Sequence, residues 1–198
     1  MQFDQDIILE NEYVLLRPLR AEDIELLGHF AQTEPSIWKY SLLQVQNEND
    51  LVKYIKQAVE ARSQKKEYPF IVFDKKKQQY AGSTRFYDIQ LQFQTLQLGY
   101  TWYGSEFQGT HINPNCKLLL LEYAFETLNM ERVEFRADNR NARSIKAMKN
   151  LGCIEEGILR NHLPTIDGGR RDSIILSILK SEWEADVKKN LIARIAKS

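Results

Sequence analysis

The sequence predicts an α+β fold, because segments of strand length and amphipathic helical segments share one continuous chain. Three consecutive segments of strand length, 68–73, 80–87 and 95–103, occupy the middle of the chain, and helical periodicity lies on both sides of them. No internal repeat, low-complexity segment or linker divides the 198 residues. We therefore expect a single domain over residues 1–198, with a C-terminal helix over residues 180–198.

Composition and charge narrow the functional classes. The chain is 43% hydrophobic and 27% charged, as in an ordinary soluble globular protein, and its formal net charge is zero. Without a basic block, the electrostatic signature of a nucleic-acid binder is missing. Residues 1–10 lack a signal-peptide pattern, and the apolar run Leu118–Leu121 is far too short to span a bilayer. Cys116 and Cys153 lack metal-ligand spacing. We expect a cytoplasmic protein with reduced thiols that binds no nucleic acid, membrane or metal.

The N-terminal part predicts one strand and two helices. Residues 14–19 have strand character, and Pro18 restricts that strand to an edge or an end. Residues 21–32 carry apolar side chains about one turn apart, which predicts an amphipathic helix. Asn49 suits the N-cap of a second helix that runs to about Ser63.

The connection between these two helices, residues 33–48, holds Trp38 and Tyr40. Two aromatic side chains in a connection can wall a substrate pocket, or they can plug the hydrophobic core. The sequence leaves both alternatives open.

The third segment, 95–103, alternates apolar and polar residues in the manner of a half-buried strand. Gly99 interrupts that alternation. A glycine inside a strand indicates a bulge or the close approach of another backbone, so we expect an irregularity here.

A turn and a helix start follow this strand at Trp102–Pro114. Asn113 is a favoured N-cap residue, and Pro114 fits the first helical turn. Unpaired amides and the positive end of the helix dipole would converge on the turn and favour an anion such as a phosphate. The turn contains one glycine, Gly109, so it is not a dinucleotide or Walker fingerprint, and an ordinary strand-to-helix turn is the alternative.

The C-terminal half predicts alternating helices and strands. The helix after Pro114 should be buried on several sides, because apolar residues surround it. A strand at 132–137, a helix at 139–150 stopped by Gly152, and strands at 153–159 and 173–179 joined by a polar turn at 167–169 complete the body.

The last helix opens with a predicted capping box at Ser181–Glu184. Its apolar side chains recur every four residues and must be buried against this body or a partner: Trp183, Val187, Leu191 and Ile195.

Several short motifs occur in a fixed order that resembles the GNAT acetyltransferase superfamily. Within it, the order is most similar to the ribosomal-protein N-terminal (alanine) acetyltransferases. The resemblance covers about Leu9 to Trp183. The motifs that carry it are Leu15–Asp23, Leu98–Trp102, Asp138–Ile145 with Leu151–Cys153, Glu156–Gly157, Arg171–Asp172 and Ser181–Trp183.

The resemblance implies a mixed, mostly antiparallel twisted sheet with helices on both faces. It also implies acetyl-CoA as cosubstrate and a primary amine as acceptor, on a protein N-terminus or a small molecule. The protein would act as a monomer or homodimer. The alternative is a catalytically weak acyl-CoA-binding module of the same fold.

In the family, a Q/R-x-x-G-x-G/A loop holds the CoA pyrophosphate on backbone amides. Laid on this chain, the loop comprises Gln108, Gly109, Thr110, His111, Ile112 and Asn113. Two positions depart from the pattern: His111 stands where glycine is usual, and Asn113 stands where glycine or alanine is usual. A side chain there restricts the backbone, although His111 could instead donate to a phosphate oxygen.

The resemblance also implies the other site residues. Tyr100, Thr101 and Trp102 would border the cofactor, and Asn141 and Ser144 would lie beside its pantetheine arm, with Ser144 as proton donor to the leaving thiolate. The alternative is that Asn141, or Asn139, caps the helix and Ser144 only packs.

The acceptor side is expected to be formed by Trp38, Tyr40, Gln97 and His162. Relatives often carry a glutamate base at the position of Gln97, and glutamine cannot act as a base. An N-terminal amine, with a pKa near 7.7–8.0, would tolerate the loss best.

Overall fold

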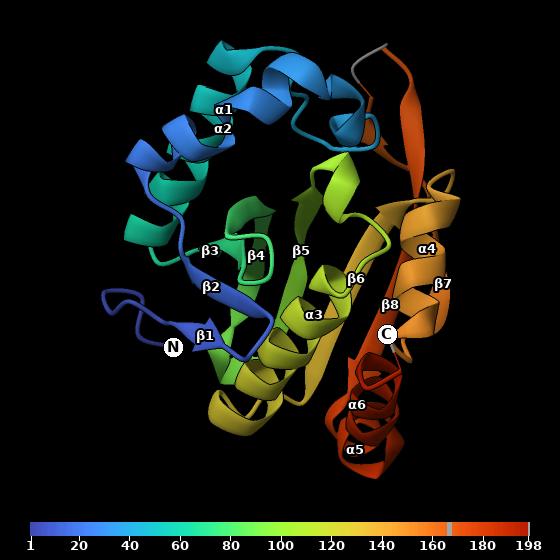
Figure 1. Cartoon of the computed structure of the whole chain (residues 1–198). Coiled ribbons are helices and arrows are strands. Elements are labelled where there is room, and N and C mark those ends of the chain that lie inside the picture. Colours follow the sequence, from blue (N-terminus) through green and yellow to red (C-terminus); the bar gives the residue numbers. More distant parts are fainter. Residues whose placement is uncertain (166–167, 198) are drawn as a thin grey trace.

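Eight strands form one mixed sheet in the computed structural model, which describes residues 1–165 and 168–197 (Figure 1). The strand order is β1-β2-β3-β4-β5-β6-β8-β7, and each neighbouring pair is antiparallel except β5 and β6, which are parallel. The strands are β1 (Leu9–Glu10), β2 (Val14–Pro18), β3 (Tyr68–Asp74), β4 (Gln79–Gln90), β5 (Thr95–Tyr103), β6 (Arg132–Asp138), β7 (Ile154–Pro164) and β8 (Arg170–Leu179). The predicted α+β class with a mostly antiparallel sheet is confirmed.

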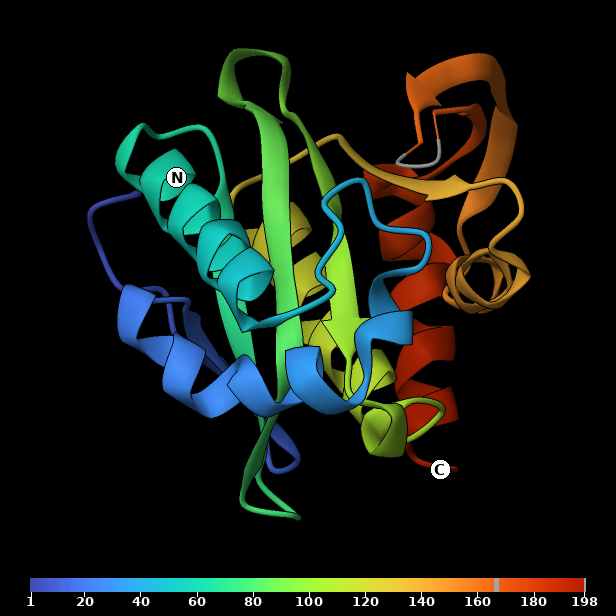
Figure 2. The ribbon, with the colours of Figure 1, turned by 90° about the horizontal axis from the view of Figure 1, so that it is seen from above.

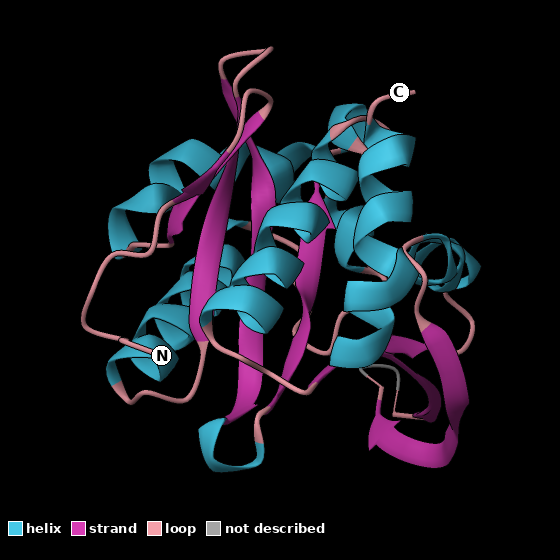
Figure 3. Cartoon of the chain, turned by 90° about the horizontal axis from the view of Figure 1, so that it is seen from below, coloured by secondary structure: helices cyan, strands magenta, loops and turns pink. Residues whose placement is uncertain are grey.

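Helices cover both faces of the sheet, as expected. Figure 2 shows α1 and α2 on the near face, and Figure 3 shows α3 and the C-terminal helix on the opposite face. The helices are α1 (Ile24–Thr33), α2 (Glu48–Ser63), α3 (Ile112–Glu122), α4 (Ala142–Asn150), α5 (Lys180–Glu182) and α6 (Lys188–Ile195), with π-helical turns at Tyr123–Thr127 and Trp183–Val187. Within the described residues, no helix combines the length and apolar character needed to cross a bilayer.

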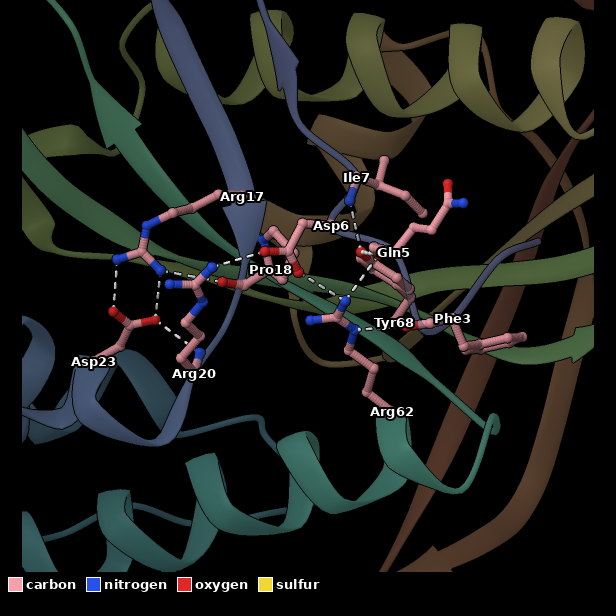
Figure 4. Close-up of polar contacts among 10 residues, drawn as sticks. All are labelled: Phe3, Gln5, Asp6, Ile7, Arg17, Pro18, Arg20, Asp23, Arg62 and Tyr68. Carbon is pink, nitrogen blue, oxygen red and sulfur yellow. Dashed lines mark hydrogen bonds and ion pairs between the residues drawn. The ribbon is translucent and has the colours of Figure 1, made fainter.

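The Leu15–Asp23 motif has a structural role at the N-terminus (Figure 4). Arg17 in β2 forms a bidentate pair with Asp23, with Nη–Oδ distances of 2.6 and 2.9 Å, and so fixes the start of α1 against the sheet. Arg20 and Arg62 both contact the carboxylate of Asp6, at 2.7 and 2.9 Å. These contacts hold the first residues of the chain onto α2.

Several predicted boundaries were wrong, although each element exists. The N-cap of α2 is Asn47, not Asn49, because the Asn47 side chain accepts the Asp50 N–H at 3.1 Å. The helix predicted from Asn139 begins at Ala142. Strands β4 and β7 run several residues beyond their apolar patterns, since pairing continues along the polar ends. Of the predicted turn at 167–169, Asp167 lies outside the described residues.

The last helix begins at Lys180, but the capping box predicted at Ser181–Glu184 does not form its start. Its N-cap position is Leu179, whose N–H donates to Glu182 at 2.8 Å, so Ser181 does not cap it. Its apolar stripe is buried against this body, because Trp183 is 1% exposed and stacks on Phe125 with 5.5 Å between ring centroids.

Candidate functional site

The parallel pair β5–β6 opens into a cavity. The two strands pair only over Thr95–Gln97 and Arg132–Glu134, although β5 continues to Tyr103. A cavity of about 330 Å³ lies beyond this pairing. Both strands line it, together with α3, α4, the 33–48 connection and β8. The gap in the ladder is therefore where a ligand can enter the sheet.

The cavity reaches both faces of the sheet. Thr101 faces α3, because its Oγ1 accepts a hydrogen bond from Lys117 Nζ at 3.0 Å. Tyr100 faces α2, because the Arg85 guanidinium lies 4.2 Å from its ring centroid and 4.8 Å from that of Tyr54. Tyr100, Thr101 and Lys117 all line the same cavity. Two reactants could thus approach each other from opposite faces of the sheet.

A β-bulge interrupts β5 at the cavity. Ser83 pairs with Trp102 and Arg85 with Gly99, so β5 has one residue more than β4 in this stretch. Tyr100 adopts a left-handed conformation with φ of +48°. The predicted bulge is confirmed, but the group that approaches Gly99 is the Tyr87 ring, which a Cβ would meet at 2.9 Å. The bulge interrupts the β4–β5 ladder, and the Tyr100 carbonyl accepts a hydrogen bond from the Tyr54 hydroxyl at 3.3 Å.

The turn before α3 leaves its backbone open at Gly109, which makes it a candidate anion cradle. Gly109 has φ of +74°, and no atom lies within 4 Å of where its Cβ would be, so its backbone is open to a ligand. The Gln108 amide donates to Tyr103 O at 2.7 Å, which ties the turn to β5. Gln108, Gly109 and Asn113 line the cavity.

The remaining turn residues serve the helix start. Asn113 is not the N-cap, because α3 begins at Ile112 and the cap position is His111, whose side chain makes no capping bond. The Thr110 hydroxyl donates to Phe107 O at 2.7 Å and accepts the Ile112 N–H at 3.3 Å. Pro114 lies in the first turn, as predicted.

His111 points away from the cavity. Its Nε2 lies 3.3 Å from Oδ1 of the buried Asp74, and its ring contacts Tyr13 with 5.9 Å between centroids. The possibility that His111 meets a phosphate is therefore not supported by its position. The sequence could not reveal this, because Asp74 lies 37 positions earlier in the chain.

The two residues singled out on α4 lie in the cavity wall, and one of them also caps the helix. The Asn141 side chain accepts the Ser144 N–H at 3.1 Å, so Asn141 rather than Asn139 is the N-cap. Both Asn141 and Ser144 line the cavity. Arg143 donates to Gln108 Oε1 and joins α4 to the turn, whereas Arg140 is paired with Asp138 at 2.8 Å.

Both alternatives for the 33–48 connection describe part of it. Trp38 is 1% exposed and packs on Trp102 with 4.7 Å between centroids, so it belongs to the core. Trp38 and Tyr40 also line the cavity, so the same plug forms the wall of a pocket.

The two other residues expected on the acceptor side do not line the cavity. Gln97 is buried and donates to Asp88 at 2.7 Å, which directs its amide away toward the end of β4. His162 lies on β7, where burial and the charges of Arg136, Arg171 and Arg170 lower its pKa. His162 is thus near the cavity's basic edge but not in its wall.

Two buried cations of the cavity wall were not anticipated from the sequence. Lys117 is 5% exposed, and burial lowers its pKa to about 8. Arg171, on β8, is 7% exposed and also lines the cavity. The sequence did contain a signal for Lys117, because a lysine within a helix that is expected to be buried is rare and often functional. In the sequence, Arg171 stands out only as part of a motif.

The cysteines and the carboxylates offer no metal site in the part of the chain that the structure describes, where no group of three His, Cys, Asp or Glu could hold a metal. Cys116 and Cys153 are buried, and burial raises the pKa of each thiol to about 12. They pack as uncharged residues.

Comparison with known proteins identifies relatives of this chain. Residues 14–154 match a family described as an acetyltransferase (GNAT) domain. Over 90 residues, 46% of this chain and 48% of the other protein, the sequence is 36% identical to YdaF of Bacillus subtilis (strain 168), which is named as a ribosomal N-acetyltransferase. The match thus spans about half the length of that relative.

Two solved structures illustrate the shared fold. A crystal structure titled as an acetyltransferase from T. thermophilus is 30% identical, with a TM-score of 0.84 over 94% of this chain and 96% of that one. RimJ of Mycobacterium smegmatis, titled as a complex with CoA-disulfide, has a TM-score of 0.77 at 19% identity over 96% and 93% of the chains.

Proposed function

Because the chain belongs to the GNAT acetyltransferase family, we propose that it transfers the acetyl group of acetyl-CoA directly to a primary amine. The amine would belong to a protein N-terminus or to a small molecule. The observation that carries this proposal is the passage through the sheet between β5 and β6. Its lining includes Gln108 and Gly109 of the turn before α3, Asn141 and Ser144 at the start of α4, and the aromatic side chains of Trp38, Tyr40 and Tyr100. A donor and an acceptor could meet there at the bulge of β5.

The described residues fit the cosubstrate, which supplies the activated thioester when bound. Gly109 leaves its backbone open, and Gln108 and Arg143 link the turn to α4 at the mouth of the cavity. The diphosphate would lie over the turn 108–113, where amides and the helix dipole favour negative charge. The pantetheine arm would follow the gap past Ser144 and Thr101.

Groups at the bulge of β5 and around it would stabilise the charges that form at the thioester carbonyl and on the leaving thiolate. Backbone N–H groups near Tyr100 would stabilise the negative charge that develops on the oxygen, an effect of roughly 2.7–4 kcal/mol per donor. The Ser144 hydroxyl would donate a proton to the departing thiolate. The charge of Lys117, beside Thr101, would favour the same thiolate.

The acceptor would reach the carbonyl from the α1/α2 face. No Asp or Glu other than Asp138 is among the described residues that line the cavity, and Asp138 is held by Arg140. The amine would therefore lose its proton to solvent before attack. An N-terminal amine does so readily near pH 8.

Thermal denaturation with acetyl-CoA tests the binding half of this proposal. A ligand that binds only the folded state raises the melting temperature, so we expect an increase at millimolar acetyl-CoA. Gly109→Val should abolish the increase, because a side chain would occupy the cradle. Gly168→Val is the matched control, since Gly168 has a similar φ of +81° and open surroundings. Equal loss in both variants would contradict the placement of the diphosphate.

A thiol-release assay with a panel of amines and peptides tests the catalytic half. Turnover with at least one acceptor is expected. Tight acetyl-CoA binding with no release above background would instead identify an acyl-CoA-binding module, the alternative suggested by Gln97, His111 and Asn113.

Ser144→Ala tests the proton donor. We expect kcat to fall about 10²-fold or more, while the Kd for acetyl-CoA changes little, because general acid catalysis contributes at that scale. Ser63→Ala at the end of α2 is the control. If kcat is unchanged in Ser144→Ala, Ser144 only packs and the role is withdrawn.

A further inference from the structure

Arg171 is a buried cation without a carboxylate partner. It is 7% exposed and lines the cavity. Its Nε donates to Ser173 Oγ at 3.0 Å and its Nη1 to Tyr40 O at 3.3 Å, both neutral acceptors. Among the described residues, no carboxylate lies within ion-pair distance of it, and Nη2 has no hydrogen-bond partner. A guanidinium buried in this way lacks the anion that normally compensates its desolvation.

The place of Arg171 assigns it to the acceptor half of the passage. It contacts Tyr40 in the connection between α1 and α2, which lie on the face opposite α3. Its charge also acts on the side chains of Tyr87 and Tyr100, and Tyr100 faces α2. Arg171 therefore faces the space where the amine, not the diphosphate, would enter.

The surroundings of Arg171 are predominantly basic. Arg136 lines the same cavity, with its Nε paired to Glu134 at 2.6 Å, and burial followed by the charges of Arg136, Arg171 and Arg170 lowers the pKa of His162. Asp138 opposes this field, but its carboxylate is bound by the Arg140 side chain at 2.8 and 3.0 Å. A polycationic acceptor would be repelled from such a site, whereas an anionic group would complete it.

We propose that the acceptor amine carries a carboxylate near the amino group and that this carboxylate pairs with the Arg171 guanidinium. The inference deepens the proposed function, on which it rests, by naming the acceptor class. The planar fork of an arginine matches a carboxylate, and a lysine could not reproduce the two parallel hydrogen bonds. The carboxylate could come from a free amino acid or from an acidic side chain behind a peptide N-terminus.

Matched acceptors test this directly. Amidated peptides Ala-Asp-Ala-Ala and Ala-Asn-Ala-Ala differ in one charge and share a similar N-terminal amine, and β-alanine and its amide form the small-molecule pair. We expect kcat/KM to favour the acidic member of at least one pair by tenfold or more. The pair that shows the preference identifies the source of the carboxylate.

Variants assign the preference to Arg171. Arg171→Gln should reduce it to within about twofold, and Arg171→Lys should retain part of it. Arg160→Gln is the matched control, because Arg160 is exposed on β7, does not line the cavity and should leave the preference intact. Unchanged acetyl-CoA affinity in all three variants verifies that the cavity is folded.

Three outcomes would overturn the inference: no preference in the wild type, a preference that persists in Arg171→Gln, or equal loss for acidic and neutral acceptors. An equal loss of kcat/KM for acidic and neutral acceptors in Arg171→Gln would show that Arg171 only holds Tyr40 in place. Binding of a fluorescent Ala-Asp peptide to the CoA-saturated protein provides a readout without turnover. If that binding depends on Arg171 while no acceptor is acetylated, the proposed function fails and the carboxylate site stands.

Discussion

Lys117 shows how a single buried charge can mark a functional site. Its ammonium donates to the Thr101 hydroxyl and lies 5.8 Å from the Phe135 ring centroid. Burial is the main cause of its lowered pKa. A methionine would fill the same space without this penalty, so the retained charge is best explained by the thiolate it would stabilise.

Replacing Lys117 with Met should stabilise the protein at neutral pH. Below about pH 8 the lysine is charged in both folded and unfolded chains, and the burial penalty is fully present. Between about 8 and 10.5 only the unfolded chain keeps the proton, so wild-type stability rises with pH. The fall in pKa from 10.5 to about 8 corresponds to roughly 3 kcal/mol.

Urea unfolding at pH 7 and pH 10 measures this effect. We expect Lys117→Met to be more stable than the wild type by a few kcal/mol at pH 7, with most of the gain lost at pH 10, and to have a lower kcat. Lys149→Met, on the exposed side of α4, is the control and should show neither change. A destabilised Lys117→Met at pH 7 would contradict the penalty.

At the scale of single residues, side-chain positions that depend on long-range contacts were the hardest to predict from the sequence. Gln97 and His111 were placed in the site by motif alignment, and the structure turns both toward carboxylates, Asp88 and Asp74. Arg171 was named as part of a motif, but its burial follows from its contacts with Tyr40 and Ser173. Local spacing contains no signal for such partners.

At the scale of elements, the sequence predicted existence well and boundaries poorly. Periodicity identified each long helix and strand, and Gly99 indicated the bulge of β5. The starts of α2 and α4 shifted by two and three positions, because neighbouring Asn residues competed for each cap and only the folded backbone shows which one accepts an amide. Asn47 and Asn141 were the actual caps of α2 and α4.

The cap of α4 yields a prediction at this scale. Asn141→Ala should lower the free energy of unfolding by about 1 kcal/mol, because the Ser144 N–H loses its acceptor. Asn139→Ala removes the competing candidate and should change stability by less than about 0.5 kcal/mol. Chemical denaturation of both variants decides between them, and equal losses would show that the cap does not depend on Asn141. Activity should fall in Asn141→Ala alone, because Ser144 is positioned by the same turn.

At the scale of the molecule, the strand order could be expected only from the family resemblance. Sequence patterns do not state that β6 pairs in parallel with β5 or that β8 inserts between β6 and β7. Yet this topology creates the site, because the parallel pair separates and leaves the passage. The C-terminal helix lies beside α3 and covers the face of the sheet away from α1 and α2 (Figure 3).

Trp183 anchors the C-terminal helix to the rest of the protein. Its indole N–H donates to Glu126 at 2.9 Å, and the same carboxylate receives Lys188 at 2.8 Å. Trp183→Ala should lower the free energy of unfolding by about 3–5 kcal/mol, since it removes a fully buried ring. Ile192→Ala, on the same helix and 44% exposed, should cost less than about 1 kcal/mol.

If residues 1–198 form one domain, Trp183→Ala should shift a single cooperative transition, observed identically by circular dichroism and by fluorescence. Acetyl-CoA should still raise its melting temperature, because none of the described residues of the C-terminal helix lines the cavity. Two separated transitions would show instead that the tail folds independently of the sheet, and a loss comparable to that of Ile192→Ala would show that the helix does not pack as observed.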